Sequence, residues 1–167
     1  SPVISKIFFF FFLNKFSVYL QTSSLQFGFK SGIGTSDALF TLKTIVDYLT
    51  QNGCTVTLAA LDISKAFDKL SHYKLFTKLM QQDVPKCFID ILMCWYTKCT
   101  VSVRWCSTYS NAFPVLAGVR QGGILSPYLF AIYIDEIIDL VSRSGKGCHI
   151  NGKFMGCLLY ADDILLI

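Results

Sequence analysis

The stretch CLLYADDILLI (residues 157–167) decides how this sequence is interpreted, because it sets two adjacent carboxylates between two apolar runs. Each run is short enough to be a buried strand. Aspartates suit a tight turn, since their side chains hydrogen-bond nearby backbone groups. The stretch therefore predicts a β-hairpin that carries Asp162 and Asp163. Like charges repel and burial of an unpaired charge is costly, so the pair favours a bound cation. An ordinary surface turn is the alternative.

A third carboxylate ends a β-prone run upstream, TVTLAALDI (55–63), in which Asp62 follows a nearly continuous apolar segment. Such a run predicts a strand that is covered on both faces. If this strand lies beside the hairpin, the three carboxylates converge. Hard oxygen ligands suit Mg²⁺, and converging carboxylates are the arrangement used in two-metal phosphoryl transfer.

Four stretches, in this order, resemble motifs of the reverse transcriptases of non-LTR (LINE-type) retrotransposons. They are LQFGFKSGIGTSDALFTLK (25–43), LDISKAFDKLSH (61–72), AGVRQGGILSPYLF (117–130) and YADD (160–163). The first is similar to a fingers motif and the others to palm motifs. The resemblance covers about residues 22–167. It implies an RNA-directed DNA polymerase with an α+β fold, in which helices back a small antiparallel palm sheet.

The resemblance also implies the catalytic residues. Asp62, Asp162 and Asp163 are expected to hold two Mg²⁺ ions, for which Mn²⁺ is a substitute, and the backbone carbonyl of Ile63 is expected near the metal. Asp68 is expected to be a turn or cap residue instead of a metal ligand. The partners implied are an RNA template with a DNA primer, and deoxynucleoside triphosphates.

Further positions are expected to contact the nucleotide or the template: Lys30, Phe67, Arg120, Gln121, Gly122 and Tyr160. By resemblance, a bulky Phe67 clashes with a ribose 2′-hydroxyl and so selects deoxynucleotides, whereas without the resemblance an ordinary core residue is the favoured interpretation. Gln121 is expected against the template and the incoming nucleotide. Arg120 is a candidate phosphate contact, and glycine at position 122 permits close backbone approach.

The first 21 residues stand apart from the resemblance as an apolar segment with five consecutive phenylalanines. Their uninterrupted apolar core, 7–13, is too short to span a bilayer, so no stable membrane insertion is expected. The chain lacks an initiating Met and stops within the strand after Asp163, so we expect a fragment without the thumb and endonuclease regions of a longer polyprotein. The family suggests a nuclear or cytoplasmic location.

Composition is consistent with this interpretation. The chain has 167 residues, enough for one domain with a core, and it is 53% hydrophobic with a net charge of +4. The basic excess agrees with nucleic-acid binding but does not establish it. The seven cysteines lack zinc-ligand spacing and are expected to be reduced thiols.

Helical periodicity predicts helices over about 37–51, 72–82, 85–98 and 126–142. Asn52-Gly53 is expected to end the first helix. The third is expected to face inward with Phe88, Ile91, Leu92 and Trp95. Thr35 or Ser36 is expected to cap the first helix. Between the third and fourth helices we expect strands at 100–103 and 113–119 around a turn at 107–111. Arg104 and Trp105 there either contact nucleic acid or belong to an edge strand with a partly buried Trp. Asn151-Gly152 predicts a hairpin with a type I′ turn.

Two other functions compete. A nucleotide cyclase also binds metals on a similar sheet, but the RQGG-then-SP pattern at 120–127 argues against it. A catalytically inactive retrotransposon remnant, with at most an RNA-binding or interaction role, remains open because intact carboxylates do not exclude it.

Overall fold

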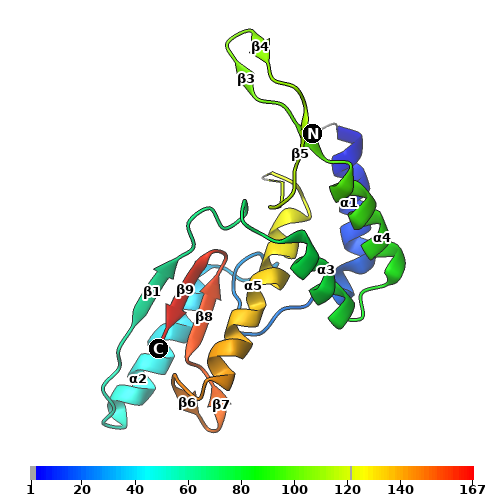
Figure 1. Ribbon diagram of the computed structural model, residues 1–167. Helices are drawn as coiled ribbons and strands as arrows, with labels where there is room; N and C mark the ends of the chain where they lie inside the picture. The colour runs from blue at the N-terminus through cyan, green and yellow to red at the C-terminus, as the bar shows by residue number, and fades with distance from the viewer. Residues whose placement is uncertain (1–2, 121) are drawn as a thin grey trace. The chain divides into compact units, whose positions relative to one another are not determined.

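The computed structural model describes residues 3–120 and 122–167, which form two compact units. One unit contains the described residues of 1–20 and 66–129, and the other contains 21–65 and 130–167 (Figure 1). Helices and small antiparallel sheets occur together in the chain, so the predicted α+β class is confirmed.

The second unit is built on a three-stranded antiparallel sheet with strand order β1-β9-β8. The strands are β1 (Ala59–Asp62), β8 (Cys157–Tyr160) and β9 (Asp163–Leu166). Strands β8 and β9 form the predicted hairpin, and β1 pairs with β9 as the predicted neighbour. Cys157 and Leu159 on β8 are fully buried, so the hairpin is anchored in the core of this unit.

Strand β1 differs from the prediction, because it is neither long nor covered on both faces. All four of its residues are exposed, and Leu61 is 50% exposed. It is an outer strand of the sheet and, among the described strands, pairs with β9 alone. An apolar run indicates strand propensity but does not identify what covers the strand.

Helix α2 (Thr35–Gln51) begins at a different cap from the one predicted. Gly34 is the N-cap, and its N–H donates to the Asp37 carboxylate at 2.7 Å. The Asp37 N–H in turn donates to the Gly34 carbonyl at 3.2 Å. An acidic side chain three residues into the helix thus replaces the expected Thr35 or Ser36 cap. The helix ends at Asn52-Gly53 as predicted.

Helix α5 (Ser126–Arg143) matches the predicted fourth helix. In the part of α5 that belongs to the second unit, Ile132, Ile134 and Ile138 are buried. Hairpin β6 (His149–Ile150) and β7 (Lys153–Phe154) turns through Asn151 and Gly152, whose φ angles are 50° and 76°. Positive φ at both central positions is characteristic of the predicted type I′ turn.

The first unit contains α1 (Val3–Phe16), the short 3-10 helix η1 (Ser17–Tyr19), α3 (His72–Gln81) and α4 (Lys86–Thr97). Phe12, the last residue of the phenylalanine run, enters its core. The Phe12 ring stacks on Phe88 with centroids 4.5 Å apart, and Phe16 meets the same ring edge-on at 4.9 Å. No helix among the described residues is long and apolar enough to cross a membrane.

Helices α3 and α4 follow their predicted bounds closely, but the buried face of α4 is rotated from the predicted one. Phe88 and Leu92 are fully buried as expected. Ile91, predicted to face inward, is 40% exposed, while Ile89 and Tyr96 are buried instead. The buried face of α4 is therefore rotated toward Ile89 and Tyr96, away from the face that the apolar pattern indicates.

The segment between α4 and α5 forms two short strand pairs. Strand β2 (Thr100–Val101) pairs with β5 (Phe113–Pro114). Strand β3 (Arg104–Trp105) pairs with β4 (Thr108–Tyr109), with Cys106 and Ser107 at the turn. The predicted turn at 107–111 is displaced, because the chain reverses at Cys106 and Ser107. The predicted strand at 113–119 is confirmed only at Phe113 and Pro114.

Candidate active site

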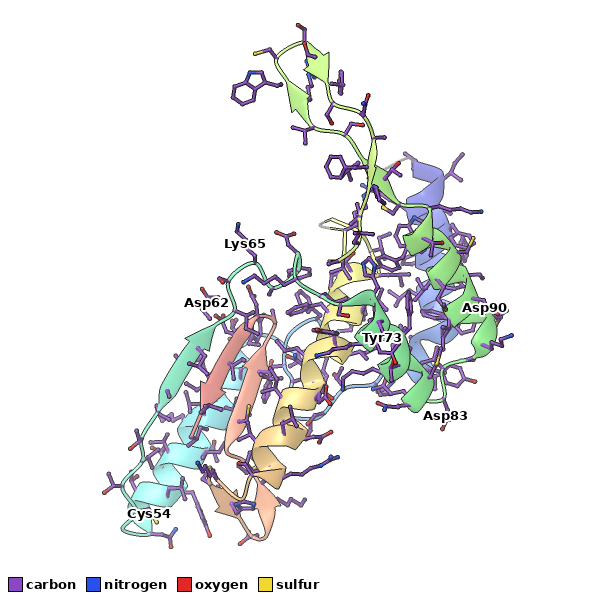
Figure 2. All side chains as sticks on the ribbon, in the orientation of Figure 1. Cys54, Asp62, Lys65, Tyr73, Asp83 and Asp90 are labelled. Carbon is purple, nitrogen blue, oxygen red and sulfur yellow. The ribbon has the colours of Figure 1, made fainter. Side chains whose placement is uncertain are left out.

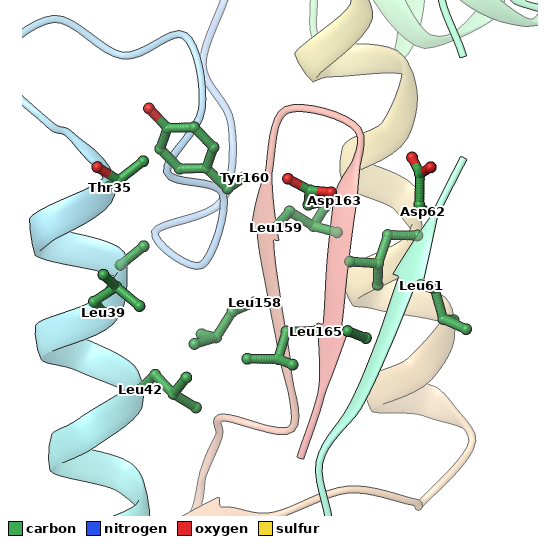
Figure 3. A pocket seen from close by; sticks show the side chains of 13 residues that line it. Thr35, Leu39, Leu42, Leu61, Asp62, Leu158, Leu159, Tyr160, Asp163 and Leu165 are labelled. Atoms are coloured by element: carbon green, nitrogen blue, oxygen red, sulfur yellow. The ribbon is translucent and has the colours of Figure 1, made fainter. Parts of the chain in front are cut away.

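Asp62 and Asp163 lie directly opposite each other in the sheet, in register between β1 and β9. Opposite residues of an antiparallel pair have Cα atoms about 4.5–5.5 Å apart and point to the same face. Both side chains are exposed, and Figure 3 shows their carboxylates at the same end of the sheet. The sheet thus places two carboxylates side by side, as the sequence predicted for neighbouring strands.

Asp162 occupies the two-residue turn between β8 and β9 together with Ala161. Ala161 has a φ of 56°, a left-handed conformation that residues with a side chain adopt rarely. Asp162 is half-buried, and Tyr160 lies opposite Asp163 in the register. The turn therefore places the third carboxylate next to the Asp62–Asp163 pair along the chain, while its own position is set by a strained backbone.

The backbone at Gly28 supports this turn, a role that the sequence alone did not reveal. The segment before it pairs with β8, since the Phe27 N–H donates to the Leu159 carbonyl at 2.8 Å. The Gly28 N–H donates to Oε1 of Gln26, a fully buried side chain. A Cβ at position 28 would lie 2.2 Å from the Ala161 nitrogen, so only glycine fits here.

An apolar cavity of about 420 Å³ opens beside the carboxylates, between α2 and the sheet. Asp62, Asp163 and Tyr160 belong to its lining. The rest is mostly apolar, and Figure 3 labels Leu39, Leu42, Leu61 and Leu158 among these residues. The carboxylates thus stand at the border of a hollow that is otherwise almost free of charge.

The donor set at the pair fits Mg²⁺. Mg²⁺ prefers oxygen ligands and commonly takes one or two carboxylates, with water and substrate phosphates completing its shell. Asp62 and Asp163 offer two such groups, both accessible to solvent. Among residues 3–120 and 122–167, no group of three or more His, Cys, Asp or Glu side chains is arranged to hold a metal ion. The fit therefore rests on two carboxylates in register, with Asp162 adjacent in sequence.

Ile63 and Lys65 follow Asp62 where strand β1 ends. Ile63 follows β1 directly and is half-buried. Figure 2 shows Lys65 just past Asp62, in the turn that follows the strand. Lys65 has a φ of 54°, so the chain bends sharply after the carboxylate. The predicted metal contact of the Ile63 carbonyl remains a prediction.

Lys30 has an internal role in the second unit. Its amine donates to the backbone carbonyls of Thr22 and Ser23, at 3.4 and 2.5 Å. The Ser23 N–H donates to the Asp135 carboxylate at 2.9 Å. Burial lowers the pKa of Lys30, and the nearby Asp135 charge partly offsets this effect. The ammonium thus helps hold the loop before α2, and its contact with a template remains a prediction.

The motif residues Phe67, Arg120 and Gly122 lie in the first unit. The Val119 N–H donates to the Phe67 carbonyl at 2.8 Å, which ties the turn after β1 to the loop before α5. Phe67 is half-buried, and Asp68 lies in a turn as predicted. Gln121 lies outside the described residues.

The loop before α5 is ordered by hydrogen bonds to Arg120. Its carbonyl accepts from the Ser126 hydroxyl at 2.5 Å and from the Gly123 N–H at 3.0 Å. The Arg120 side chain is exposed, and Gly122 has a φ of 75° with open space around it. Exposed guanidinium and unobstructed backbone are compatible with a phosphate contact.

A family model described as reverse transcriptase (RNA-dependent DNA polymerase) matches residues 12–167. The match begins within α1, upstream of the predicted boundary at residue 22, and the predicted division of the chain at that point remains a prediction.

Curated relatives agree with the family model. The chain is 29% identical over 141 residues to the Pol polyprotein of the type-2 retrotransposable element R2DM of Drosophila melanogaster, a match that covers 84% of the chain and 13% of the relative. It is 27% identical to the Pol polyprotein of a type-1 element R2 of Popillia japonica, covering 80% and 22%. It is 28% identical to the RNA-directed DNA polymerase of the mobile element jockey of Drosophila melanogaster, covering 67% and 12%. The chain thus spans between 12% and 22% of these relatives.

Proposed function

The chain belongs to the reverse transcriptase (RNA-dependent DNA polymerase) family, and from this premise we propose that it forms the fingers and palm of an enzyme that copies RNA into DNA. Its relatives are polyproteins of non-LTR retrotransposons. The expected reaction is attack of a primer 3′-hydroxyl on the α-phosphate of a deoxynucleotide, with release of pyrophosphate. The observation that carries the proposal is the register of Asp62 with Asp163, next to Asp162 in the turn.

Asp62, Asp162 and Asp163 are the residues that would hold Mg²⁺, with the Ile63 carbonyl nearby. The ion supplies charge neutralisation at the phosphates and lowers the pKa of a bound hydroxyl. Asp62 and Asp163 are exposed at the end of the sheet. Exposure leaves room for a substrate to approach the pair.

The other motif residues would hold and select the substrate. Tyr160, opposite Asp163, would support the primer end. Arg120 would contact a phosphate of the template or nucleotide, and Phe67 would exclude a ribose 2′-hydroxyl. Base pairing supplies sequence specificity, so these side chains need only position the strands.

Primer extension tests the proposal. The assay uses a poly(rA) template, an oligo(dT) primer, dTTP and Mg²⁺, with the 167-residue chain and with a longer form that continues past residue 167. Each is compared with its Asp162→Asn variant and with Asp47→Asn, an exposed carboxylate on α2, as the matched control.

We expect extension by at least the longer form, loss of extension in Asp162→Asn and full activity in Asp47→Asn. If both forms are folded and silent, the inactive-remnant interpretation replaces the polymerase. If Asp162→Asn retains activity, the carboxylates are not the catalytic centre.

A further inference from the structure

The segment between Asp90 and Asp135 contains no acidic residue. It does contain Lys98, Arg104 and Arg120, so every charge on this part of the chain is positive. A stretch with only positive charge is attractive to phosphates. In the middle of this segment lies the hairpin of β3 and β4, which Figure 1 shows at the tip of an extended arm.

The hairpin exposes large apolar and aromatic side chains, which are ordinarily buried in folded proteins. Trp105 is 79% exposed, Tyr109 63% and Val103 56%. This finding contradicts the interpretation of Trp105 as a partly buried residue of an edge strand. A two-stranded hairpin is marginally stable by itself, so large exposed aromatics on it add little to its folding.

Arg104 is held in one orientation by its neighbours. Its Nε–H donates to the Cys106 carbonyl at 3.0 Å, and its guanidinium carbon lies 5.8 Å from the centre of the Tyr109 ring. The register places Arg104 opposite Tyr109 and Trp105 opposite Thr108. Because side chains alternate between the faces of a strand, the hairpin presents the Arg104–Tyr109 pair on one face and Trp105 on the other.

We infer that this hairpin, residues 103–110, binds single-stranded nucleic acid that passes over its edge. Trp105 stacks on an unpaired base at one face, and Arg104 contacts a phosphate of the same strand at the other. The combination of positive charge with exposed aromatic rings is the one that proteins use to bind single strands without sequence preference. The absence of acidic residues across the whole segment favours a polyanion over a protein partner. The identity of the strand as RNA template rests on the proposed function.

Trp105 supplies its own reporter, because Trp95 is the only other tryptophan. Trp95 packs against Phe9 with centroids 4.3 Å apart, so Trp95→Phe keeps an aromatic ring in that place. Titration of the Trp95→Phe chain with a single-stranded RNA 20-mer should quench the remaining fluorescence, since base stacking acts on Trp105. Circular dichroism checks that each variant is folded.

Affinity is measured in parallel by fluorescence anisotropy of the labelled RNA. We expect Trp105→Ala to weaken binding at least about fivefold. Arg104→Ala should weaken it and reduce the slope of log K against log salt by about 0.7, the value for one phosphate contact on a single strand. Tyr73→Ala, a residue 80% exposed on α3, and Lys86→Ala, an exposed cation on α4, are the matched controls and should bind like wild type.

The inference is overturned if the folded chain does not bind the 20-mer, if Trp105 is not quenched, or if Tyr73→Ala weakens binding as much as Trp105→Ala. Stronger quenching by a blunt RNA duplex than by the single strand would also contradict stacking on unpaired bases. Asp162→Asn separates the two proposals, because it should abolish primer extension and leave quenching unchanged. Loss of primer extension with retention of fluorescence quenching supports both proposals.

Discussion

The Ala161 nitrogen lies only 2.2 Å from the position that a Cβ atom on Gly28 would occupy. Gly28 follows the segment that pairs with β8, while Ala161 precedes Asp162 in the turn. The backbone before α2 therefore lies directly against the carboxylate turn. This contact fixes the position of a strained turn, since Ala161 must keep its φ of 56°.

Gly28→Ala should damage the turn. The added methyl would meet backbone atoms of Ala161, which cannot move without displacing Asp162. We expect a decrease of about 3 kcal/mol in the free energy of unfolding, measured by urea denaturation. Gly34→Ala is the control, because its Cβ would lie 3.9 Å from the Asp37 carboxylate and should cost less than about 1 kcal/mol. Equal losses in the two variants would contradict the support role of Gly28.

The pairing of Asp62 with Asp163 predicts that magnesium reverses the difference in stability between wild type and Asp163→Asn. Like charges directly opposite each other in a sheet cost up to about 1 kcal/mol. Without Mg²⁺, Asp163→Asn should therefore raise the melting temperature by about 1–3 °C. With millimolar Mg²⁺ the wild type should gain stability, because the ion binds the folded state, while the variant gains little.

Differential scanning fluorimetry with and without EDTA measures this effect independently of any catalytic activity. Asp139→Asn on α5, an exposed position away from the sheet register, is the control. A magnesium response that is the same in Asp163→Asn and in wild type would show that the pair does not hold the ion.

Local signals account for the parts of the fold that the sequence predicted. Asn151-Gly152 specifies its own turn, and Asn52-Gly53 ends α2 as expected. The hairpin at Asp162 followed from two short apolar runs around turn-forming residues. Each of these depends on residues close together in the chain.

The features that were missed depend on contacts between distant residues. The orientation of Lys30 toward the Ser23 carbonyl is set by the loop that it closes. The exposure of β1 depends on which elements pack against its faces, and the glycine requirement at position 28 depends on Ala161. A phenylalanine run without polar alternation gave no clue that Phe12 stacks on Phe88.

Cys157 should be the slowest cysteine to react with a thiol reagent. It is fully buried on β8, and burial raises the pKa of its thiol to about 11. The thiolate is the reactive form, so at pH 8 Cys157 should stay unmodified by Ellman's reagent until the chain unfolds. Cys54 is exposed and should react within the mixing time of a manual assay. Mass spectrometry of the modified peptides identifies each site, and rapid labelling of Cys157 in the native chain would show that β8 opens.

Phe67→Val tests whether the aromatic ring selects deoxynucleotides or merely fills space. The Phe67 carbonyl accepts the Val119 N–H, a backbone contact that the substitution leaves in place. If the ring excludes the 2′-hydroxyl, the ratio of kcat/KM for dTTP over UTP should fall about tenfold or more, with kcat/KM for dTTP reduced much less. Primer extension by whichever form of the chain is active supplies both constants. Phe76→Val, a half-buried residue on α3, is the control for lost packing. If the two variants lose stability alike and neither changes the dTTP preference, Phe67 is a packing residue.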